Sequence, residues 1–455
     1  MSDSGVFGGA RPDRHDRASQ KNAGANQPTA QLFCRDAVNV GGAFVPRPPL
    51  TYKEALAWLY SLQRFGIKLG LENIRRLLAE LHVDLHGSCV IHVAGTNGKG
   101  SVCAMIDSIC RAQGYRTGLF ISPHLITFRE RIRVNGGMIS QDAVANGLTL
   151  IRDLVANWQP HPTFFEVTTA LGLKSFAEAK LDIVILETGL GGRLDATNAI
   201  QSDVSVITPI DFDHEKWLGD SLEKIAAEKA GIIKPGVPVV CAAQRDEAEK
   251  VIRARAIACE APLQFVTESY GRSAIGLPGD YQKQNAAVAI AAVHAAKIGI
   301  DEKAIARGLA TVECPARFQK WDGKVIIDGA HNPAAARVLA RTWREIFGDQ
   351  RATLILAVLS DKNLRGICEA LAPIAESVLL PKIRSERAAD LEVLARVLSS
   401  ITPSLPYSIP KCVGEALAVA RTRPNPILIT GSLHFAGEVL AYLRGEAAAF
   451  EECAQ

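Results

Sequence analysis

A glycine-rich loop between a short apolar strand and a helical segment is the feature that most constrains the fold of this chain. The run Ser88–Ala94 predicts a strand, and residues 101–113 predict a helix that Gly114 ends. Glycines let backbone N–H groups point inward, and a helix N-terminus adds a positive dipole end. The order therefore predicts a phosphate-binding turn, with Lys99 for the β- and γ-phosphates and Ser101 for Mg²⁺. The loop residues are Gly95, Thr96, Asn97, Gly98, Lys99, Gly100 and Ser101.

The strict pattern GxxxxGK[ST] is not met. Val93 stands where the first glycine is required, and Gly100 separates Lys99 from Ser101. A glycine-rich turn without a ligand is the alternative. The lysine, the serine and the flanking elements favour phosphate binding.

Strands and helices alternate along most of the chain, which predicts an α/β fold with a mostly parallel sheet covered by helices. Two helices are predicted within 52–82, divided by Gly66 and Gly70. Further strands are predicted at 116–121, 181–186, 204–208 and 237–241, with helices at 167–180 and 222–230. A second block predicts strands at 324–328, 353–359 and 426–430 and a helix at 334–347.

Three segments follow from this pattern. Residues 1–50 lack an apolar core and predict a disordered tail. Residues 51–314 predict an ATP-binding domain, and residues 315–455 predict a smaller doubly wound, Rossmann-like domain. The stretch 313–317 is the predicted hinge between them.

Composition narrows the class of protein. The 455 residues carry a net charge of +3, which gives no reason to propose nucleic acid or a membrane surface as a partner. No run is long enough to span a bilayer, and the first 50 residues have no secretory h-region. The acidic residues Asp3, Asp13 and Asp16 disfavour a transit peptide. Ten cysteines without a CxxC pair predict reduced core thiols in a cytoplasmic protein.

At the glycine loop the sequence resembles the Mur ligase superfamily, and further motifs narrow the resemblance to the bifunctional folylpolyglutamate synthase/dihydrofolate synthase family. The resemblance covers about residues 51–445. Two departures concern the segment before and after His214: Pro209 stands where the family more often has Ser, and Glu215 with Lys216 replaces a small or acidic pair. The motifs are ISPHL at 121–125, RER at 129–131, ETGLGGRLDATN at 187–198, DH at 213–214, WLG at 217–219, EKAG at 228–231, PARFQ at 315–319, DGAHNP at 328–333, SDK at 360–362 and GSL at 431–433.

The resemblance implies an ATP-dependent ligase that phosphorylates a carboxylate of a folate or dihydropteroate and joins it to L-glutamate. It implies ATP and Mg²⁺, with two ions as an option, small-molecule substrates and a monomer. Lys229 resembles a position that is carbamoylated in the superfamily. His331 is expected to contact the nucleotide or the acyl phosphate. Implied metal ligands are Ser101, Ser122, Glu166 and His214, and implied nucleotide ligands beyond the loop are Asn285, Arg317 and Asp328.

Ordinary structural roles, without a ligand, stay open for several of these residues. Glu166 is also suited to cap the helix predicted from 167, Lys229 to lie on a charged surface, and His331 to be a satisfied loop histidine. If the segment is extended, Arg129, Arg131 and Arg133 share one face of a strand. That face would contact an anionic folate or the metal loop, or it would be exposed to solvent. Alternative functions are a Mur ligase acting on a UDP-muramoyl precursor and a non-catalytic nucleotide-binding relative; too few residues precede the first strand for a UDP-sugar domain.

Overall fold

The structure is a computed structural model that describes residues 48–66, 68, 70–446 and 451. The tail predicted at 1–50 therefore lies outside the described residues except for its last three. Order was expected from about Thr51, and the first helix, α1 (Tyr52–Ser61), begins one residue later. The Thr51 side chain accepts from the backbone of Glu54 while the Glu54 carboxylate accepts from the Thr51 backbone. This reciprocal capping box explains why the helix begins there.

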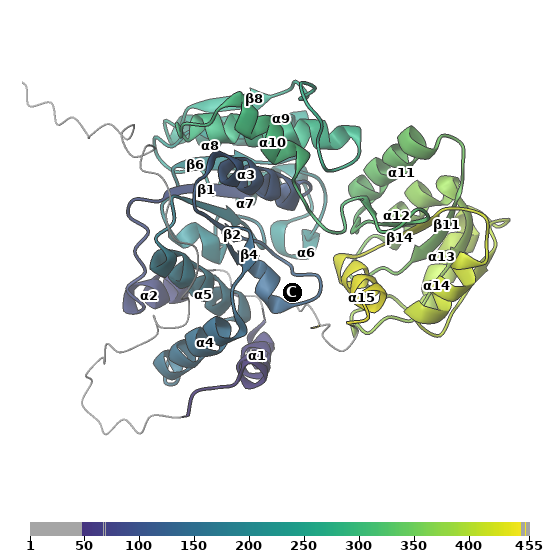
Figure 1. Ribbon diagram of the computed structural model, residues 1–455, viewed down its shortest axis with the longest axis horizontal. Helices are drawn as coiled ribbons and strands as arrows, with labels where there is room; N and C mark the ends of the chain where they lie inside the picture. The colour runs from purple at the N-terminus through teal and green to yellow at the C-terminus, as the bar shows by residue number, and fades with distance from the viewer. Residues whose placement is uncertain (1–47, 67, 69, 447–450, 452–455) are drawn as a thin grey trace, which may run out of the picture. The chain divides into compact units, whose positions relative to one another are not determined.

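The described residues from 48 to 310 contain an eight-stranded sheet in the order β4-β3-β2-β5-β1-β6-β7-β8 (Figure 1). Strands β2, β5, β1, β6, β7 and β8 are parallel, as the alternating pattern predicts. The pairs β2–β3 and β3–β4 are antiparallel, so the expectation of a mostly parallel sheet is confirmed with an antiparallel edge. The strands are β1 (Cys89–Ala94), β2 (Thr117–Phe120), β3 (Ile132–Val134), β4 (Gly137–Met138), β5 (Ile183–Glu187), β6 (Val204–Ile207), β7 (Val239–Ala242) and β8 (Leu263–Val266).

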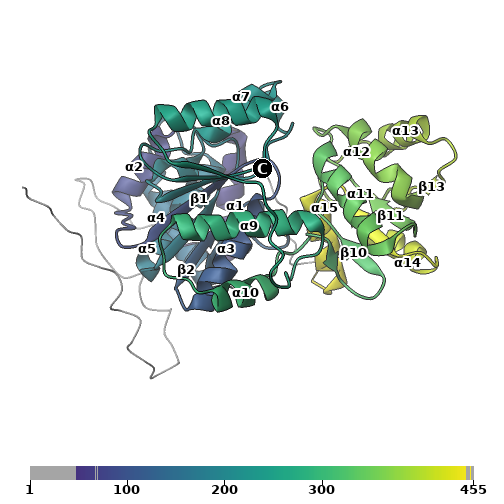
Figure 2. The same ribbon diagram turned by 90° about the horizontal axis from the view of Figure 1, so that it is seen from above.

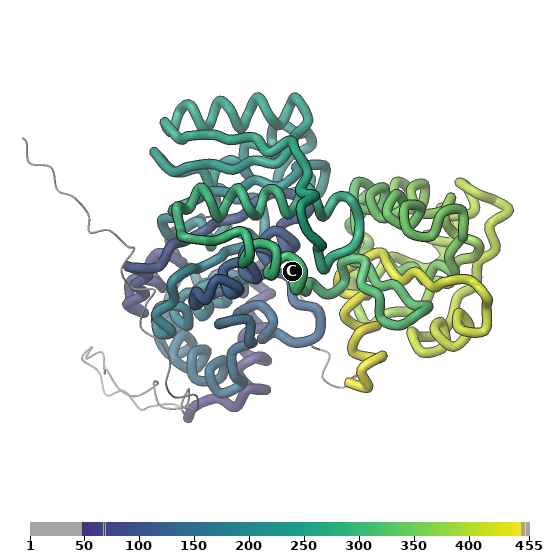
Figure 3. Tube along the Cα trace, turned by 45° about the horizontal axis from the view of Figure 1, so that its top comes forward, coloured from purple at the N-terminus to yellow at the C-terminus, as the bar shows by residue number. Residues whose placement is uncertain are grey.

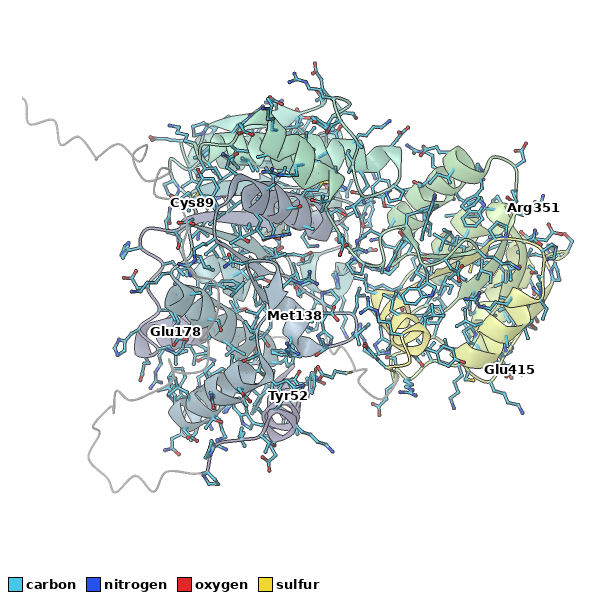
Figure 4. All side chains as sticks on the ribbon, viewed as in Figure 1. Tyr52, Cys89, Met138, Glu178, Arg351 and Glu415 are labelled. Carbon is cyan, nitrogen blue, oxygen red and sulfur yellow. The ribbon has the colours of Figure 1, made fainter. Side chains whose placement is uncertain are left out.

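Helices cover both faces of this large sheet. One apolar cluster joins it to α1, α2, α4 and α5; Tyr52 and Glu178, labelled in Figure 4, belong to this layer. A second joins it to α3, α9 and α10, and Figure 2 shows α3 and α9 along the same face. A third packs α7 and α8 beside β6 and β7. The helices are α2 (Glu72–Glu80), α3 (Lys99–Gln113), α4 (Gln141–Val155), α5 (Phe164–Ala179), α6 (Glu215–Leu218), α7 (Leu222–Ala230), α8 (Asp246–Ala258), α9 (Asp280–Ala295) and α10 (Glu302–Ala310), with short 3₁₀ turns η2 (Leu62–Phe65), η3 (Phe128–Arg131) and η4 (Ala196–Ala199).

The chain then enters a second, six-stranded sheet in the described residues, in the order β13-β12-β11-β14-β10-β9. Figure 3 shows the trace passing from the green α10 into this region through residues 311–318. Only β9 is antiparallel. The domain boundary predicted at 314/315 falls in this connection and stays a prediction. The elements are β9 (Gln319–Lys320), β10 (Val325–Ile327), α11 (Pro333–Phe347), β11 (Ala352–Leu356), α12 (Leu364–Leu371), η5 (Ala372–Ile374), β12 (Ala375–Leu379), α13 (Leu391–Ile401), β13 (Tyr407–Ser408), α14 (Val413–Arg421), β14 (Ile427–Thr430) and α15 (Leu433–Leu443).

An apolar joint links the loop after β2 to the second sheet. Leu125 and Ile126 are buried in the same cluster as strands β10, β11 and β14 and helix α15. A Cβ at Gly437 of α15 would collide with the backbone of Leu125. Glycine is therefore required for this approach. The loop that carries the ISPHL motif is thus fixed between the two sheets.

Among the residues that the structure covers, no helix combines the length and apolar character needed to cross a bilayer. Eight cysteines within the same residues carry no disulfide, and six of them are buried. The prediction of core thiols is confirmed for those six. Cys34 and Cys453 lie outside the described residues.

Candidate active site

Four adjacent strands of the large sheet end at one edge and carry the motif residues. The lateral order β2-β5-β1-β6 brings together the segments that follow each of these strands. Ser122 follows β2, Glu187 ends β5, the glycine loop follows β1, and His214 follows β6. Ligands of open parallel sheets bind at this edge, outside the carboxyl ends of the strands.

The glycine loop has the backbone that its sequence requires. Gly95 has φ 146° and Gly98 has φ 89°, conformations that residues with a Cβ rarely adopt. A Cβ at Gly98 would lie 2.8 Å from Asn285 Oδ1, so the glycine also allows the close approach of α9. Helix α3 begins at Lys99, two residues earlier than predicted, so the loop leads directly into the helix N-terminus.

Pro209 supports the loop through its carbonyl group. The N–H groups of Thr96 and Asn97 donate to Pro209 O at 3.0 and 3.2 Å, and Thr96 Oγ1 donates to Asp211 O. Proline differs from other residues here in lacking a backbone N–H, but its carbonyl oxygen is intact. Because the loop amides donate to that oxygen, proline can serve at this position. The departure at this position therefore preserves the support of the loop.

Two lysines share one acceptor beneath the loop. Lys99 Nζ donates to Gly95 O at 3.0 Å, and Lys229 Nζ donates to the same oxygen at 2.8 Å. Lys229 is buried, so its interpretation as a surface lysine is wrong. Burial, followed by repulsion from Lys99, lowers the pKa of Lys229 to about 7, although Asp213 and Asp195 act in the opposite direction.

Ser122 and Glu187 form a polar pair beside the loop. The backbone N–H of Ser122 donates to Glu187 Oε2 at 3.2 Å, and both residues are buried. Within the described residues the Ser122 hydroxyl has no hydrogen-bond partner. Burial raises the pKa of Glu187, while Lys99, the Ser122 amide and Arg317 lower it. A buried unpaired hydroxyl beside a carboxylate is suited to hold a hard cation.

Glu166 is not brought to this pair. Helix α5 begins at Phe164 rather than 167, so Glu166 lies in the first turn of the helix. Its Oε2 accepts from the backbone and the hydroxyl of Thr163 at 2.8 and 2.9 Å. The capping interpretation is therefore the one that the structure supports, in a buried rather than a solvated form. Glu187, which the sequence interpretation did not single out, has the position that Glu166 was expected to have.

Asp213 and His214 follow β6 at the same edge. Partial burial, with the positive charges of Lys362, Lys229 and Lys99, lowers the pKa of His214 to about 4 against the effect of Asp213. The imidazole is therefore neutral at pH 7, the form that ligates metals. Burial alone would raise the pKa of Asp213, but His331, His214 and Lys362 together hold it well below its ordinary range.

The second sheet contributes Arg317 and Asp328. Asp328 follows β10, and its carboxylate accepts from the amides of Phe318 and Ala330 at 2.7 and 2.8 Å. Burial raises its pKa, and Arg317 is the strongest opposing influence. Arg317 itself lies between two residues in the left-handed region, Ala316 at φ 57° and Phe318 at φ 46°. A Cβ built at Gly100 would lie 3.8 Å from both Arg317 Nη2 and Glu187 Oε1, so the guanidinium reaches the phosphate loop.

Three further side chains of the second sheet converge on Asp213. Lys362 Nζ lies 2.7 Å from Asp213 Oδ1, and Asn332 Nδ2 donates to Oδ2 at 3.2 Å. His331 Nε2 is 3.5 Å from the same Oδ2, while its Nδ1 is 2.9 Å from Gly329 O. His331 therefore contacts its own loop and also faces the edge of the large sheet. Lys362 and Asn332 belong to the sequence motifs, but the sequence predicted no role for either residue.

The three arginines after the ISPHL motif do not share a strand face, contrary to the conditional expectation. Residues 128–131 form the 3₁₀ turn η3, which breaks the alternation before β3 begins. Arg131 is fully buried and its Nε donates to His124 Nδ1 at 2.9 Å. Arg129 Nε donates to Ile139 O instead. The arginines therefore form neither a solvent-exposed strand face nor a single row that faces a substrate.

Two adjoining cavities occupy the edge. The first, of about 420 Å³, contains most of the predicted site: its lining includes the whole glycine loop and Ser122, His214, Lys229, Asn285, Arg317, Asp328 and His331, together with Glu187. The second, of about 620 Å³, is lined by Glu166 with Thr163, Phe164, Phe165, Asp195, Ala196 and Trp217. Both fall in the usual range for small-molecule sites. The two cavities share Gly189, Leu190, Asp213, His214, Lys362 and Arg387.

The first cavity suits a cation that is held partly by its ligand. Among the described residues, no three His, Cys, Asp or Glu side chains are grouped so that they alone would hold a metal. The unpaired hydroxyl of Ser122, the Glu187 carboxylate and the neutral His214 supply one donor each. Mg²⁺ is commonly bound by one or two protein groups together with phosphate oxygens and water. These residues fit that mode.

Family models match both regions. Residues 93–259 match the Mur ligase middle domain, and residues 316–433 match the Mur ligase glutamate ligase domain. Among curated proteins, the dihydrofolate synthase/folylpolyglutamate synthase of Bacillus subtilis is 35% identical over 86% of this chain and 99% of its own length.

Solved structures agree. Folylpolyglutamate synthase of Mycobacterium tuberculosis, complexed with ADP and AMPPCP, has a TM-score of 0.79 at 32% identity, covering 87% of this chain and 99% of that one. A bifunctional folylpolyglutamate synthase/dihydrofolate synthase with Mn, AMPPNP and L-glutamate bound has a TM-score of 0.77 at 30% identity, covering 87% and 100%.

Proposed function

Since this chain belongs to the folylpolyglutamate synthase/dihydrofolate synthase family of Mur ligases, we propose that it is an ATP-dependent ligase that joins L-glutamate to dihydropteroate, to (poly)glutamylated tetrahydrofolate, or to both. One observation carries the proposal: the cavity with the phosphate loop opens into a second, aromatic cavity across the shared residues Asp213, His214, Lys362 and Arg387. A phosphoryl donor and a carboxylate acceptor can meet at that junction.

Nucleotide binding rests on the loop and its neighbours. The amides after Asn97 and the ammonium of Lys99 neutralise the β- and γ-phosphates. Asn285, which contacts the loop at Gly98, and Asp328 line the same cavity and would bind the nucleotide there. Arg317 adds a positive charge above Gly100. These groups act on charge that develops as the γ-phosphoryl group moves to the folate carboxylate.

A divalent cation fits beside these groups. Two of the solved relatives hold AMPPNP together with Mn, which supports a nucleotide and a divalent metal as ligands of this site. For this chain the ion is Mg²⁺, held by Ser122, Glu187 and His214, with Ser101 at the phosphates. Glu187 replaces Glu166 in this set. The ion would screen the phosphate charge as the phosphoryl group transfers. A second ion stays a prediction.

Lys229 is proposed to be carbamoylated. A neutral amine is needed to react with CO₂, and a pKa of about 7 leaves much of the Lys229 side chain neutral at physiological pH. The carbamate would replace a buried cation next to Lys99 with an anion. That change turns repulsion between the two side chains into attraction and adds a negative group near the cation site.

The second cavity suits a pterin ring. Its deep end is lined by the buried Phe164, Glu166 and Asp195, together with Phe165. Aromatic walls stack on a planar heterocycle, and carboxylates accept from ring N–H groups. A folate placed there would direct its carboxylate toward the junction. Glutamate would reach the acyl phosphate from the side of Lys362, Arg387 and His331, which are the cationic or donor groups of the second sheet.

The test is substrate-dependent release of inorganic phosphate. The purified protein with ATP and Mg²⁺ should release phosphate only when both a folate and L-glutamate are added. A comparison of dihydropteroate with tetrahydrofolate then separates the two activities. Release that requires a UDP-muramoyl substrate, or no release with any acceptor, would contradict the proposal. Location in the cytoplasm and a monomeric state stay predictions from the sequence.

A further inference from the structure

The second cavity changes character from its deep end to its mouth. Thr163, Phe164, Glu166, Asp195 and Ala196 at the deep end are buried. The mouth is formed by exposed residues: Gln63, Gly66, Lys68, Phe212, Glu215, Lys216, Trp217, Asp361, Asn363 and Arg387. A ligand of this cavity therefore has an enclosed end and a solvated end.

The carboxylates of the deep end already accept hydrogen bonds from protein groups. Glu166 accepts from Thr163, and Asp195 accepts from the amides of Gly189, Leu190 and Thr197 at 2.8 to 3.0 Å. Their negative charge is shared among these donors. The exposed lysines of the cavity lie instead at its mouth.

Two lysines at the mouth make no ion pair among the described residues, although the charge of Lys68 acts on Glu166 and lowers the pKa of that carboxyl. Lys216 Nζ lies 5.8 Å from the ring centre of Trp217, and Lys68 Nζ donates to His161 O beside the Phe65 ring. By contrast, Arg387 is paired with Asp361 at 3.0 Å.

We propose that Lys68 and Lys216 bind the α-carboxylates of a γ-linked glutamyl tail, so that this protein prefers folates that already carry several glutamates. This inference rests on the proposed function and specifies its substrate. In such a tail the terminal γ-carboxylate lies at the junction with the first cavity, where it is phosphorylated. Each preceding residue presents a free α-carboxylate, and the mouth is the solvated region where those anions meet cations.

A bare pteroate makes no use of these lysines. Its single carboxylate must lie at the junction to react, so none is left for the mouth. A contact between exposed charges changes affinity by about two- to five-fold and weakens with salt. The lysines therefore discriminate by tail length while contributing little to the chemical step.

The experiment compares the KM values of tetrahydropteroyl-tri-γ-glutamate and tetrahydropteroyl-monoglutamate in the full-length protein. The double variant Lys68→Gln/Lys216→Gln should raise the ratio of the triglutamate KM to the monoglutamate KM about ten-fold. Glu215→Gln, which removes the neighbouring negative charge at the same mouth, should lower that ratio. High salt should bring wild type and double variant together.

Equal changes in both KM values, or an unchanged ratio, would overturn the assignment of the lysines. The proposed function is judged separately. If wild type forms no glutamyl bond with any folate, the ligase proposal fails. Equilibrium binding of the two folates in the presence of a non-hydrolysable ATP analogue then still reports whether the lysines select the longer tail.

Discussion

Lys362 Nζ and Asp213 Oδ1 are 2.7 Å apart, and each side chain is only 8% exposed. One residue follows β6 of the large sheet, and the other follows β11 of the second sheet. The pair lies between the two cavities and contributes to the wall of each. Asn332 strengthens this connection because its amide also donates to Asn97 Oδ1 of the phosphate loop at 3.1 Å.

Removing only one member of this pair should destabilise the protein. Lys362→Met leaves a buried carboxylate without its closest cationic partner and is expected to cost about 3 kcal/mol of unfolding free energy. Adding Asp213→Asn should recover much of that loss. A double-mutant cycle tests this: urea unfolding gives the unfolding free energies of wild type, the two single variants and the double variant. Additive losses would show that the contact contributes no coupling.

Lys99→Ala is expected to lower the rate of glutamate ligation by roughly 10²–10³-fold, because a preorganised positive charge at the phosphates is lost. Among the described residues, the Lys99 ammonium donates to two carbonyl groups of its own loop, Gly95 O and Thr96 O, so the circular dichroism spectrum should be unchanged. Retained ligation in a folded variant would refute the role. Lys283→Ala, on an exposed ion pair with Asp280, is the matched control.

The buried amine of Lys229 should make stability depend on pH in a defined direction. Its pKa falls from the ordinary value of 10.5 to about 7 on folding, so between those values the unfolded state binds more protons. The unmodified protein therefore gains stability as the pH rises through this window, by at most about 1.4 kcal/mol per pH unit relative to Lys229→Met. Unfolding curves in CO₂-free buffers test this, and parallel profiles for the two proteins would contradict it.

Bicarbonate provides an independent test of the Lys229 carbamate. Activity measured in CO₂-depleted buffer should be lower and should return when bicarbonate is added. Lys229→Arg should be inactive under both conditions because a guanidinium stays charged and does not form the carbamate. An active enzyme with an unmodified Lys229 amine in a density map would exclude this role.

Glu187 and Glu166 should respond differently to the same substitution. Glu187→Gln removes a carboxylate beside Ser122 and is expected to raise the Mg²⁺ concentration needed for half-maximal activity. Glu166→Gln keeps an oxygen that accepts from the Thr163 amide, because a capping box takes either Glu or Gln, so stability should change by only about 0.5 kcal/mol and the Mg²⁺ requirement should stay the same. Metal titrations and thermal unfolding of both variants separate the two roles. Equal metal dependence for both would place the two carboxylates in one site.

The sequence was sufficient for features that depend on local order. Helix α7 has the predicted bounds, and the glycine loop lies between its strand and helix as expected. Glu166 was predicted as a metal ligand and Glu187 was not singled out, because a linear sequence does not state which strands are neighbours. Once β5 is placed between β2 and β1, its terminal Glu187 must meet Ser122 and the loop.

A second class of error came from short-range geometry. The arginines at 129, 131 and 133 have the spacing of a strand, but Thr127 and Glu130 form a capping box that tightens the first part into a 3₁₀ turn. The Glu130 carboxylate also accepts from the amides of Leu125 and Ile126. Spacing alone did not reveal this competition.

The left-handed backbone on both sides of Arg317 has a consequence for protein engineering. Each strained non-glycine residue costs on the order of 1 kcal/mol or more, so Ala316→Gly would release strain while increasing the freedom of the unfolded chain by a similar amount. The melting temperature should therefore change little. The direction of the guanidinium, however, would no longer be dictated by the main chain. A substitution at residue 316 can therefore leave the melting temperature unchanged and still lower the catalytic rate.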